Sequence, residues 1–210
     1  MEVSIANIMD NIKKLEEMFA QFPGIGPRQA KRFVHYVLSR SNSTINEFVR
    51  LLTETKKSTS ECINCHRLFL TDTSLTLCNI CNDKSRDNSL LMIVARDSDF
   101  ETIERSGVYK GRYFILGGTV PILDSEPEKR IRLKKLLEYI SKSKNISEII
   151  ISLNTNREGE HTLDILKDAL NRIKAQNTKV SVLGRGLSTG AEIEYADSET
   201  IKYALKNRFS

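Results

Sequence analysis

The stretch Ile-Ile-Ile-Ser-Leu-Asn-Thr-Asn-Arg-Glu-Gly-Glu at residues 149–160 decides the fold class of this chain. Its apolar start is typical of a buried strand, and its polar centre and charged end indicate a loop that leads into a helix. Strands that alternate with helices of this length predict a parallel sheet covered on both faces. The same pattern surrounds the stretch, so we expect strands at 90–95, 113–116, 148–153 and 179–183, and helices after residue 98 and at 128–141 and 160–174.

The segments on either side of this α/β region are expected to be helical. Apolar residues spaced three and four apart predict a helix over 5–19, and Pro27 suits the first position of a second helix over 27–38. Thr44 has the spacing of a capping box with Glu47, which predicts a third helix over 44–55, and Ser98 has the same spacing with Glu101. Asp197 is expected to cap a last helix that ends near residue 206.

Composition and charge narrow the class of protein. The longest apolar run, residues 90–95, is far shorter than the roughly 20 residues that cross a bilayer, and the first residues lack the apolar core of a secretion signal. We therefore expect a cytoplasmic protein with no membrane partner. The net charge is +5, and two stretches are strongly basic: residues 28–57 hold seven Lys and Arg against two Glu, and residues 129–144 hold seven against one. These stretches suit a polyanion, although solvated helix faces explain them equally well.

All four cysteines belong to one pattern, Cys62-x2-Cys65-x12-Cys78-x2-Cys81. Each pair fits a tight turn, and four thiolates can close a tetrahedron around Zn²⁺. Such a site has no open position for water, so we expect one structural zinc per chain, which folds a segment too small for its own core. Two disulfides are the alternative, and a reducing compartment disfavours them.

A glycine-bracketed turn joins the first two expected helices. Phe22-Pro23-Gly24-Ile25-Gly26-Pro27 matches the helix-hairpin-helix pattern, in which an apolar residue lies between two glycines. Gly24 and Gly26 let the backbone approach a phosphate, and the next helix points free N–H groups at the anion. Arg28 lies beside this helix start and Arg32 lies one turn on, so we expect DNA binding that is independent of base sequence. An ordinary helix–helix turn is the alternative.

The stretch 149–160 resembles the second signature of Toprim domains, which topoisomerases and bacterial primases share. The resemblance implies that catalytic members carry two aspartates after this strand and a glutamate at the end of the first strand, where they bind Mg²⁺. Here Asn154, Asn156 and Ala95 occupy those positions, so we expect no Mg²⁺ chemistry and no enzymatic activity. Four nearby acids, Asp97, Asp99, Glu158 and Glu160, could instead rebuild a shifted metal site. Alternatively, Asp97, Asp99 and Glu158 cap helices and Glu160 faces solvent. For Glu158 and Glu160 we favour a third interpretation, an acidic patch for a protein partner.

Helix-hairpin-helix, four-cysteine segment and Toprim signature, in that order, resemble the RecR family over essentially the whole chain. Residues 104–107, 110–113, 185–190 and 194–197 agree with that family as well. The resemblance implies an α+β multi-module protein: a DNA-binding module (1–58), a four-cysteine zinc finger (59–84), a Toprim domain with a parallel-rich sheet (88–184) and a C-terminal oligomerisation tail (185–210). It also implies a nucleoid-associated mediator of recombinational DNA repair, which binds single- and double-stranded DNA as a homodimer or ring-like homotetramer. Members act with RecO and RecF to load RecA on DNA coated by SSB protein.

The sequence departs from the family pattern at two points, and two other functions are alternatives to the one that the resemblance implies. The spacing between the cysteine pairs is longer than the family usually shows, and members commonly carry a glutamate where this chain has Ala95, which would alter a RecO surface. The alternative function is a Mg²⁺-dependent Toprim nuclease or topoisomerase-like enzyme that uses the residual acids. We find no activated nucleophile for it among Tyr109, Tyr113 and Tyr195. A purely structural zinc module is the third hypothesis, and the basic hairpin argues against it.

Overall fold

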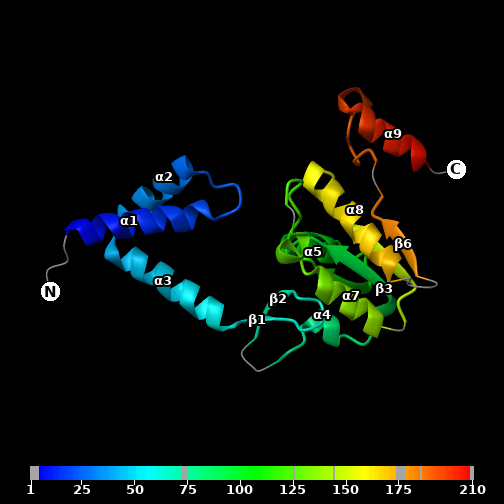
Figure 1. Cartoon of the computed structure of the whole chain (residues 1–210), viewed down its shortest axis with the longest axis horizontal. Coiled ribbons are helices and arrows are strands. Elements are labelled where there is room, and N and C mark those ends of the chain that lie inside the picture. Colours follow the sequence, from blue (N-terminus) through cyan, green and yellow to red (C-terminus); the bar gives the residue numbers. More distant parts are fainter. Residues whose placement is uncertain are drawn as a thin grey trace. The chain divides into compact units, whose positions relative to one another are not determined.

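The computed structural model of the chain describes residues 5–71, 75–124, 126–143, 145–173, 178–184 and 186–208. Lys144, Lys174 and Arg185, which belong to the expected basic stretch, the expected helix 160–174 and the RecR-like stretch 185–190, lie outside the described residues. The chain divides into two compact units, the N-terminal unit (residues 1–59) and the C-terminal unit (residues 60–210). Figure 1 shows both units, with elements labelled where there is room.

The N-terminal unit contains three helices among its described residues: α1 (Ile5–Ala20), α2 (Pro27–Leu38) and α3 (Asn42–Lys57). Helices α1 and α2 pack together, with Ala30 and Val34 of α2 buried. The Phe19 ring stacks on the Phe33 ring at a centroid distance of 5.9 Å. The first two helices begin and end close to the residues that the apolar spacing predicts.

The predicted start of the third helix is wrong. Helix α3 begins at Asn42, and its cap is Ser41, whose hydroxyl accepts a hydrogen bond from the Thr44 N–H at 3.2 Å. Thr44 is therefore the third residue of the helix and not its cap, and the Glu47 carboxylate pairs with the Arg50 guanidinium at 2.7 Å. The helix buries no residue, which leaves its apolar side chains without a core.

A four-stranded parallel sheet forms the centre of the C-terminal unit. Its strands lie in the order β4-β3-β5-β6, and each neighbouring pair is parallel. The predicted parallel sheet is therefore confirmed. The bounds of the strands are β3 (Asp87–Val94), β4 (Gly111–Ile115), β5 (Glu148–Ser152) and β6 (Lys179–Val182).

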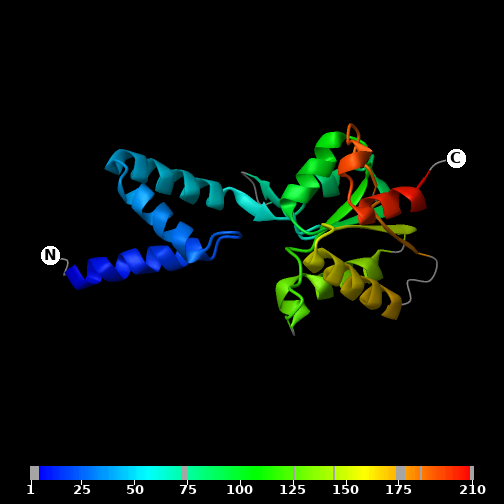
Figure 2. The same cartoon turned by 90° about the horizontal axis from the view of Figure 1, so that it is seen from above.

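Helices cover both faces of this sheet (Figure 2). On one face, α7 (Leu133–Lys142) and α8 (Arg157–Arg172) pack on Leu91, Ile93 and Ile151. On the other face, α5 (Asp97–Ser106) packs through Phe100 on alternate strand residues, and the cysteine segment joins the same core. This segment consists of β1 (Thr59–Glu61), β2 (Leu68–Leu70) and α4 (Asn79–Asn82). The sheet thus places the cysteines against its second hydrophobic core.

The helix predicted at 128–141 is broken into two. Helix α6 (Pro127–Arg130) ends at Ile131, whose backbone is extended and whose side chain is buried, and α7 follows. The Arg132 N–H donates to the carbonyl of Leu116 at 2.8 Å. This bond to the chain after β4 and the burial of Ile131 account for the break, because a continuous helix would give neither.

The expected capping box at Ser98 is also wrong, whereas the cap at Asp197 is confirmed. Helix α5 begins at Asp97, and the carboxylate of Asp99 accepts a hydrogen bond from the Arg96 N–H at 3.0 Å. Asp197 caps α9 (Ser198–Lys206) by accepting from the N–H groups of the second and third helical residues at 2.9 Å each. A short 3₁₀ turn (Ile193–Tyr195) precedes α9. None of the helices described here has both the length and the apolar character that a membrane span requires.

Candidate metal centre and nucleic-acid interface

The four cysteines converge on one point in the C-terminal unit. Cys62 follows β1, Cys65 lies in the turn after it, Cys78 is the N-terminal cap of α4 and Cys81 lies within that helix. Their sulfur atoms all lie within 4.8 Å of one another. Cys62, Cys65 and Cys78 are almost fully buried, and Cys81 is partly buried. The two predicted pairs therefore form a single cluster that could hold a metal ion.

The donor set suits a soft, positively charged ion. The Sγ atoms of Cys65 and Cys78 lie 3.6 Å apart, and the Cys78 N–H donates to the Sγ of Cys62 at 3.4 Å. The Cys65 thiol lowers the pKa of Cys62 by donating a hydrogen bond to it, and this same interaction raises the pKa of Cys65. Without a cation, these thiols can carry only part of the negative charge of four thiolates. A bound Zn²⁺ would remove that competition, because each thiolate would bind the metal.

The cysteine segment also covers the outer edge of the sheet. Strand β4 is an edge strand, and its Ile115 N–H donates to the carbonyl of Cys65 at 2.9 Å. The guanidinium of Arg112 in the same strand donates to the carbonyls of Ile80 and Asp83, the latter at 2.8 Å. Backbone groups of an edge strand need such partners, because open edges pair with other chains. The metal segment and the edge strand are thus one structural unit.

The hairpin of the N-terminal unit has an open backbone and two exposed arginines beside it. Gly24 has φ of +77°, a conformation that side chains disfavour, and Gly26 is the extended N-terminal cap of α2. No atom lies within 4 Å of a Cβ built on either glycine, so the backbone is open to a ligand. Arg28 and Arg32 are exposed on α2, and the described residues give neither of them an acidic partner. The structure therefore leaves both guanidinium groups available to an anion.

A hollow of about 430 Å³ lies beside this hairpin, and the sequence reasoning missed it. The aromatic residues Phe33 and Tyr36 contribute to its wall, and they are 43% and 58% exposed. The available signal was helical spacing, since Tyr36 lies four residues after Arg32 and three residues after Phe33. The hollow is lined by Ile25, Gln29, Arg32, Phe33 and Tyr36.

Of the two amides at the positions where the Toprim resemblance implies acids, Asn156 bonds to the backbone through its side chain, whereas Asn154 is exposed. The ends of β3 and β5 are neighbours in the sheet, with Val94 in register with Ser152. Ala95, next to the first of these ends, is 1% exposed. Asn156 is the N-terminal cap of α8, and its side-chain oxygen accepts from the Gly159 N–H at 2.9 Å. Helix α8 therefore begins at Arg157, earlier than the predicted residue 160, because this cap precedes it.

The space around Gly159 keeps this loop tight. A Cβ at Gly159 would lie 1.9 Å from the backbone oxygen of Asn154, closer than any real contact. Only glycine fits here, and the chain after β5 folds directly over the start of α8. The connection between β5 and α8 is correspondingly short and consists of residues 153–156.

The residual acids do not gather into a metal site among the described residues. There, the four cysteines form the one group of three or more potential ligands close enough to share an ion. Asp97 accepts a hydrogen bond from the Leu68 N–H at 2.9 Å, and Asp99 accepts from the backbone of Arg96. The Glu158 carboxylate accepts from the Thr119 hydroxyl at 3.1 Å. Asp97 thus connects two elements, and Asp99 caps α5.

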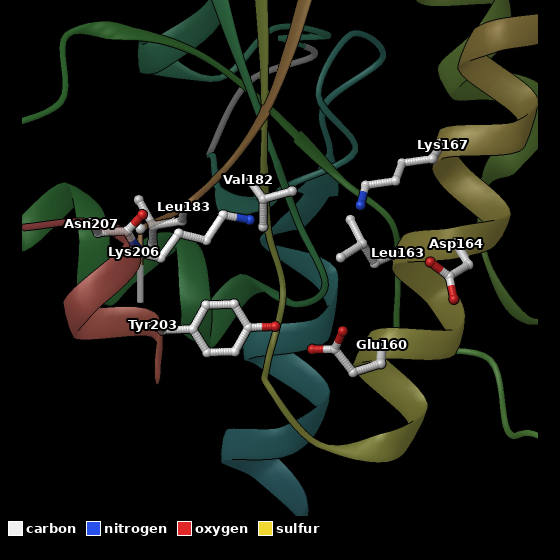
Figure 3. Close-up of a pocket in the computed structure, with 10 residues that line it drawn as sticks. Glu160, Leu163, Asp164, Lys167, Val182, Leu183, Tyr203, Lys206 and Asn207 are labelled. Atoms are coloured by element: carbon white, nitrogen blue, oxygen red, sulfur yellow. The ribbon is translucent and has the colours of Figure 1, made fainter. Parts of the chain in front are cut away.

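Glu158 and Glu160, both expected to bind a partner, lie in different surroundings. Glu158 is exposed, whereas Glu160 is partly buried and lines a hollow of about 290 Å³ between α8, β6 and α9. Figure 3 shows the Glu160 carboxylate and the Tyr203 hydroxyl pointing toward one another across this hollow. The C-terminal helix α9 therefore contributes to the surroundings of Glu160, while Glu158 stays accessible.

Two of the tyrosines considered as nucleophiles, Tyr109 and Tyr113, are shielded from solvent within the fold. Burial raises the pKa of Tyr109, and burial together with a hydrogen bond to Glu104 raises the pKa of Tyr113. The Tyr113 hydroxyl donates to the Glu104 carboxylate at 3.0 Å, and the Arg86 guanidinium pairs with the same carboxylate. A tyrosine attacks as its oxyanion, which this burial disfavours. Tyr195 is exposed in the 3₁₀ turn, and no cationic partner is described beside it.

Comparisons with known proteins cover the chain almost completely. Residues 89–184 match the model of the Toprim domain, and residues 186–208 match that of the RecR C-terminal region. A protein of Prochlorococcus marinus (strain MIT 9301) named "Recombination protein RecR" is 36% identical over 197 residues, which are 94% of each chain. One of the same name from Cereibacter sphaeroides (strain ATCC 17029 / ATH 2.4.9) is 32% identical over 204 residues, 97% of this chain and 98% of that protein. A third from Ruegeria sp. (strain TM1040) is 31% identical over 198 residues, 94% and 95% of the two chains.

These matches extend from the hairpin unit through the cysteine cluster and the parallel sheet to the C-terminal helix. With this coverage and identity, the chain belongs to the RecR family of recombination proteins.

Proposed function

We propose that this protein is a non-enzymatic, DNA-binding adaptor of recombinational repair, which acts with RecO and RecF to load RecA on single-stranded DNA coated by SSB protein. In this proposal, residues 1–58 bind DNA, residues 59–84 hold structural zinc, residues 88–184 form the partner-binding Toprim domain and residues 185–210 serve oligomerisation. Its working place is the cytoplasm, on the nucleoid. Membership of the RecR family and the chemistry of the described surfaces support these assignments.

The hairpin is the observation that carries the proposal. Gly24 with its positive φ and the open backbone at Gly26 lie at the start of a helix. Arg28 and Arg32, which have no acidic partner among the described residues, complete an anion site there. Phosphates contact such sites through backbone N–H groups and guanidinium groups together. These contacts carry no base information, so binding to single- and double-stranded DNA is independent of sequence.

The metal has a structural role in this proposal. The four cysteines would hold one Zn²⁺ per chain, and the metal would supply the bonds that a segment of this size cannot obtain from a core. Four thiolate ligands leave no coordination position for water or substrate. The chain's own contribution is the burial of the cluster and the Cys78 N–H that is directed at a sulfur atom.

The Toprim positions support an adaptor and not a nuclease. Ala95 offers no ligand atom, and the oxygen of Asn156 is already bonded to the Gly159 N–H. Glu158, with its exposed carboxylate, is the accessible half of the proposed acidic partner surface, and Glu160 forms its base beside α9. Ala95 replaces a carboxylate that other members present, so this surface relies on Glu158 and Glu160.

Self-association completes the adaptor. Helix α3 buries no residue of its own unit, and Phe48, Val49, Leu51 and Leu52 on it are about half exposed. An apolar face of this kind suits a second copy of the chain, in a homodimer or a ring-like homotetramer. Light scattering should give a mass above that of one chain. The Leu52→Glu variant should have a lower mass, closer to that of a single chain. A wild type of monomer mass with and without DNA would contradict this part.

Charge reversal at the hairpin tests the main proposal. Arg28→Glu together with Arg32→Glu should remove most of the DNA affinity, because both guanidinium groups become repulsive carboxylates. Fluorescence anisotropy on single-stranded and duplex oligonucleotides measures the loss, and circular dichroism and zinc content show that the fold stays intact. The matched control is Arg172→Glu with Lys202→Glu, which changes the net charge equally on two exposed helix positions outside both basic stretches. Undiminished binding by the hairpin variant would transfer the DNA site to the basic stretch 129–144.

A further inference from the structure

A line of side chains continues the hairpin arginines along α2. Arg28, Arg32 and Tyr36 follow one another at intervals of four residues, which places them on one side of the helix, and Arg40 lies two residues beyond the last helical residue, Leu38. The buried residues Ala30 and Val34 lie on other positions of the helical turn. The line therefore runs along the outer side of α2, from the phosphate site at its start to the aromatic hollow described above.

The two aromatic rings of this hollow, Phe33 and Tyr36, are exposed to solvent, and each also contacts a neighbouring side chain. Phe33 stacks on Phe19 with an interplanar angle of 28°, yet 43% of it is exposed. Tyr36 is 58% exposed, and the guanidinium carbon of Arg40 lies 3.9 Å from the centre of its ring. A ring with one face on a neighbour and a large exposed remainder is a platform for a flat, aromatic ligand.

The charged side chains of α2 and of the turns on either side of it are all positive. Residues 18–46 contain no aspartate or glutamate, while they contain Arg28, Lys31, Arg32 and Arg40. The described residues give none of these four cations an acidic partner. A ligand that suits this surface therefore combines negative charge with an exposed aromatic ring.

We propose that the hollow receives an unpaired nucleobase of single-stranded DNA, which stacks on Tyr36 and Phe33 while the neighbouring phosphates lie on Arg28 and Arg32. This inference rests on the proposed DNA-binding function and adds to it the class of DNA that the site prefers. Stacking on an aromatic ring tolerates every base, because every base has a π face. The Gln29 amide in the wall can donate to a base edge and accept from it. Duplex DNA keeps its bases paired and stacked, so it would use the arginines alone.

A second copy of the chain suits this hollow less well. In a two-fold symmetric interface a patch meets itself, so the hollow would bring Arg28, Arg32 and Arg40 against the same three cations. Like charges at close range disfavour such a contact. The apolar face of α3, where Arg50 is paired with Glu47 and Glu54, does not have this excess of positive charge. The hollow on α2 is therefore assigned to a polyanion with exposed rings.

An oligonucleotide without bases separates stacking from phosphate contact. Anisotropy titrations would use full-length protein with three probes of equal length: a mixed-sequence single strand, an abasic single strand and a duplex. Tyr36→Ala should weaken binding to the mixed-sequence strand roughly 5- to 150-fold, as expected for the loss of one stacked base. It should leave binding to the abasic strand and the duplex unchanged. Tyr36→Phe, which keeps the ring, should bind as the wild type does.

Leu38→Ala is the matched control, because Leu38 is a half-exposed apolar residue of the same helix and does not line the hollow. Equal wild-type affinity for the mixed-sequence and abasic strands, with both lost in the Arg28→Glu and Arg32→Glu double variant, would overturn the inference and leave the proposed function standing. No affinity for any of the probes would end both. An unchanged DNA profile together with a changed mass in light scattering would reassign the hollow to self-association.

Discussion

The carboxylate of Asp97 accepts a hydrogen bond of 2.9 Å from the backbone N–H of Leu68, 29 residues earlier in the chain. Asp97 is the first residue of α5, and Leu68 is the first residue of β2 in the cysteine segment. The bond connects the metal segment to the helix that covers the same face of the sheet. Asp97, which the sequence suggested as a residual metal ligand, therefore joins α5 to β2.

Replacing Asp97 should loosen the metal segment. Asp97→Ala removes the acceptor of the Leu68 N–H and should lower the free energy of unfolding by about 1 kcal/mol, while Asp97→Asn keeps an oxygen there and should cost less. Urea denaturation measures the change, and the rate of metal release to a chromophoric chelator should rise in parallel. Glu101→Ala, an exposed acid of the same helix, is the control. Equal stability and release rates in Asp97→Ala and wild type would contradict the assignment.

Metal analysis tests the cysteine cluster directly. We expect about one zinc per chain from elemental analysis, because four thiolates bind one ion. Cys62→Ser and Cys81→Ser should each destabilise the chain by more than about 4 kcal/mol, the class of effect that follows loss of a structural metal. All four cysteines of the chain belong to the cluster, so a thiol reagent should react with four groups only after a chelator is added. A metal-free protein with two disulfides in its mass spectrum would contradict this prediction.

Variants of Asn156 distinguish two roles for this residue, a helix cap and a residual metal ligand. Asn156→Ala should cost about 0.5–2 kcal/mol, because the Gly159 N–H loses its partner, whereas Asn156→Asp keeps an oxygen at the cap and should be close to wild type. Thermal unfolding measures both variants. With Mg²⁺ or Mn²⁺, neither the wild type nor these variants should cleave or relax plasmid DNA. DNA cleavage that disappears on Glu158→Ala or Asp97→Ala would instead support the nuclease hypothesis.

The dependence of DNA affinity on salt concentration reports the number of phosphate contacts at the hairpin. Arg28→Ala should reduce the slope of log affinity against log salt by about 0.7 on single strands and about 0.9 on duplex, as one phosphate contact is lost. The loss should be the same for oligonucleotides of different sequence, because phosphates carry no base information. Arg172→Ala, outside both basic stretches, should leave the slope unchanged. A slope that does not respond to Arg28→Ala would remove this arginine from the phosphate site.

The strands were predictable because their residues are apolar on both faces. Leu91, Ile93 and Ile151 are buried on one side and Met92 and Val94 on the other, and such continuous runs are typical of a parallel sheet between two layers. Helix starts were less predictable, because several side chains near each start can act as the cap. Ser41 lies three residues before Thr44, and both can cap a helix in sequence terms; the structure selects Ser41, whose hydroxyl accepts from the Thr44 N–H.

The candidate site divides in the same way. The convergence of the four cysteines on one point was predictable from their spacing, since four cysteines in two close pairs have few other uses in a chain of this kind. The hollow beside Tyr36 was not, because exposed rings on a helix have the same spacing as core residues, and only packing distinguishes the two. The bond between Asp97 and Leu68 joins residues that are far apart in sequence, and no local pattern indicates it.

The cover of the β4 edge links the state of the cysteine cluster to the exposure of an edge strand. While the cluster is formed, the Ile115 N–H is bonded to Cys65 and the Arg112 side chain holds the following turn. If the cluster holds the structural zinc proposed above, the metal also shields β4, because without it the segment would lose its fold and an edge strand of mostly apolar residues would be open to pairing with other chains. We therefore expect the metal-free protein to aggregate more readily than the metal-loaded protein.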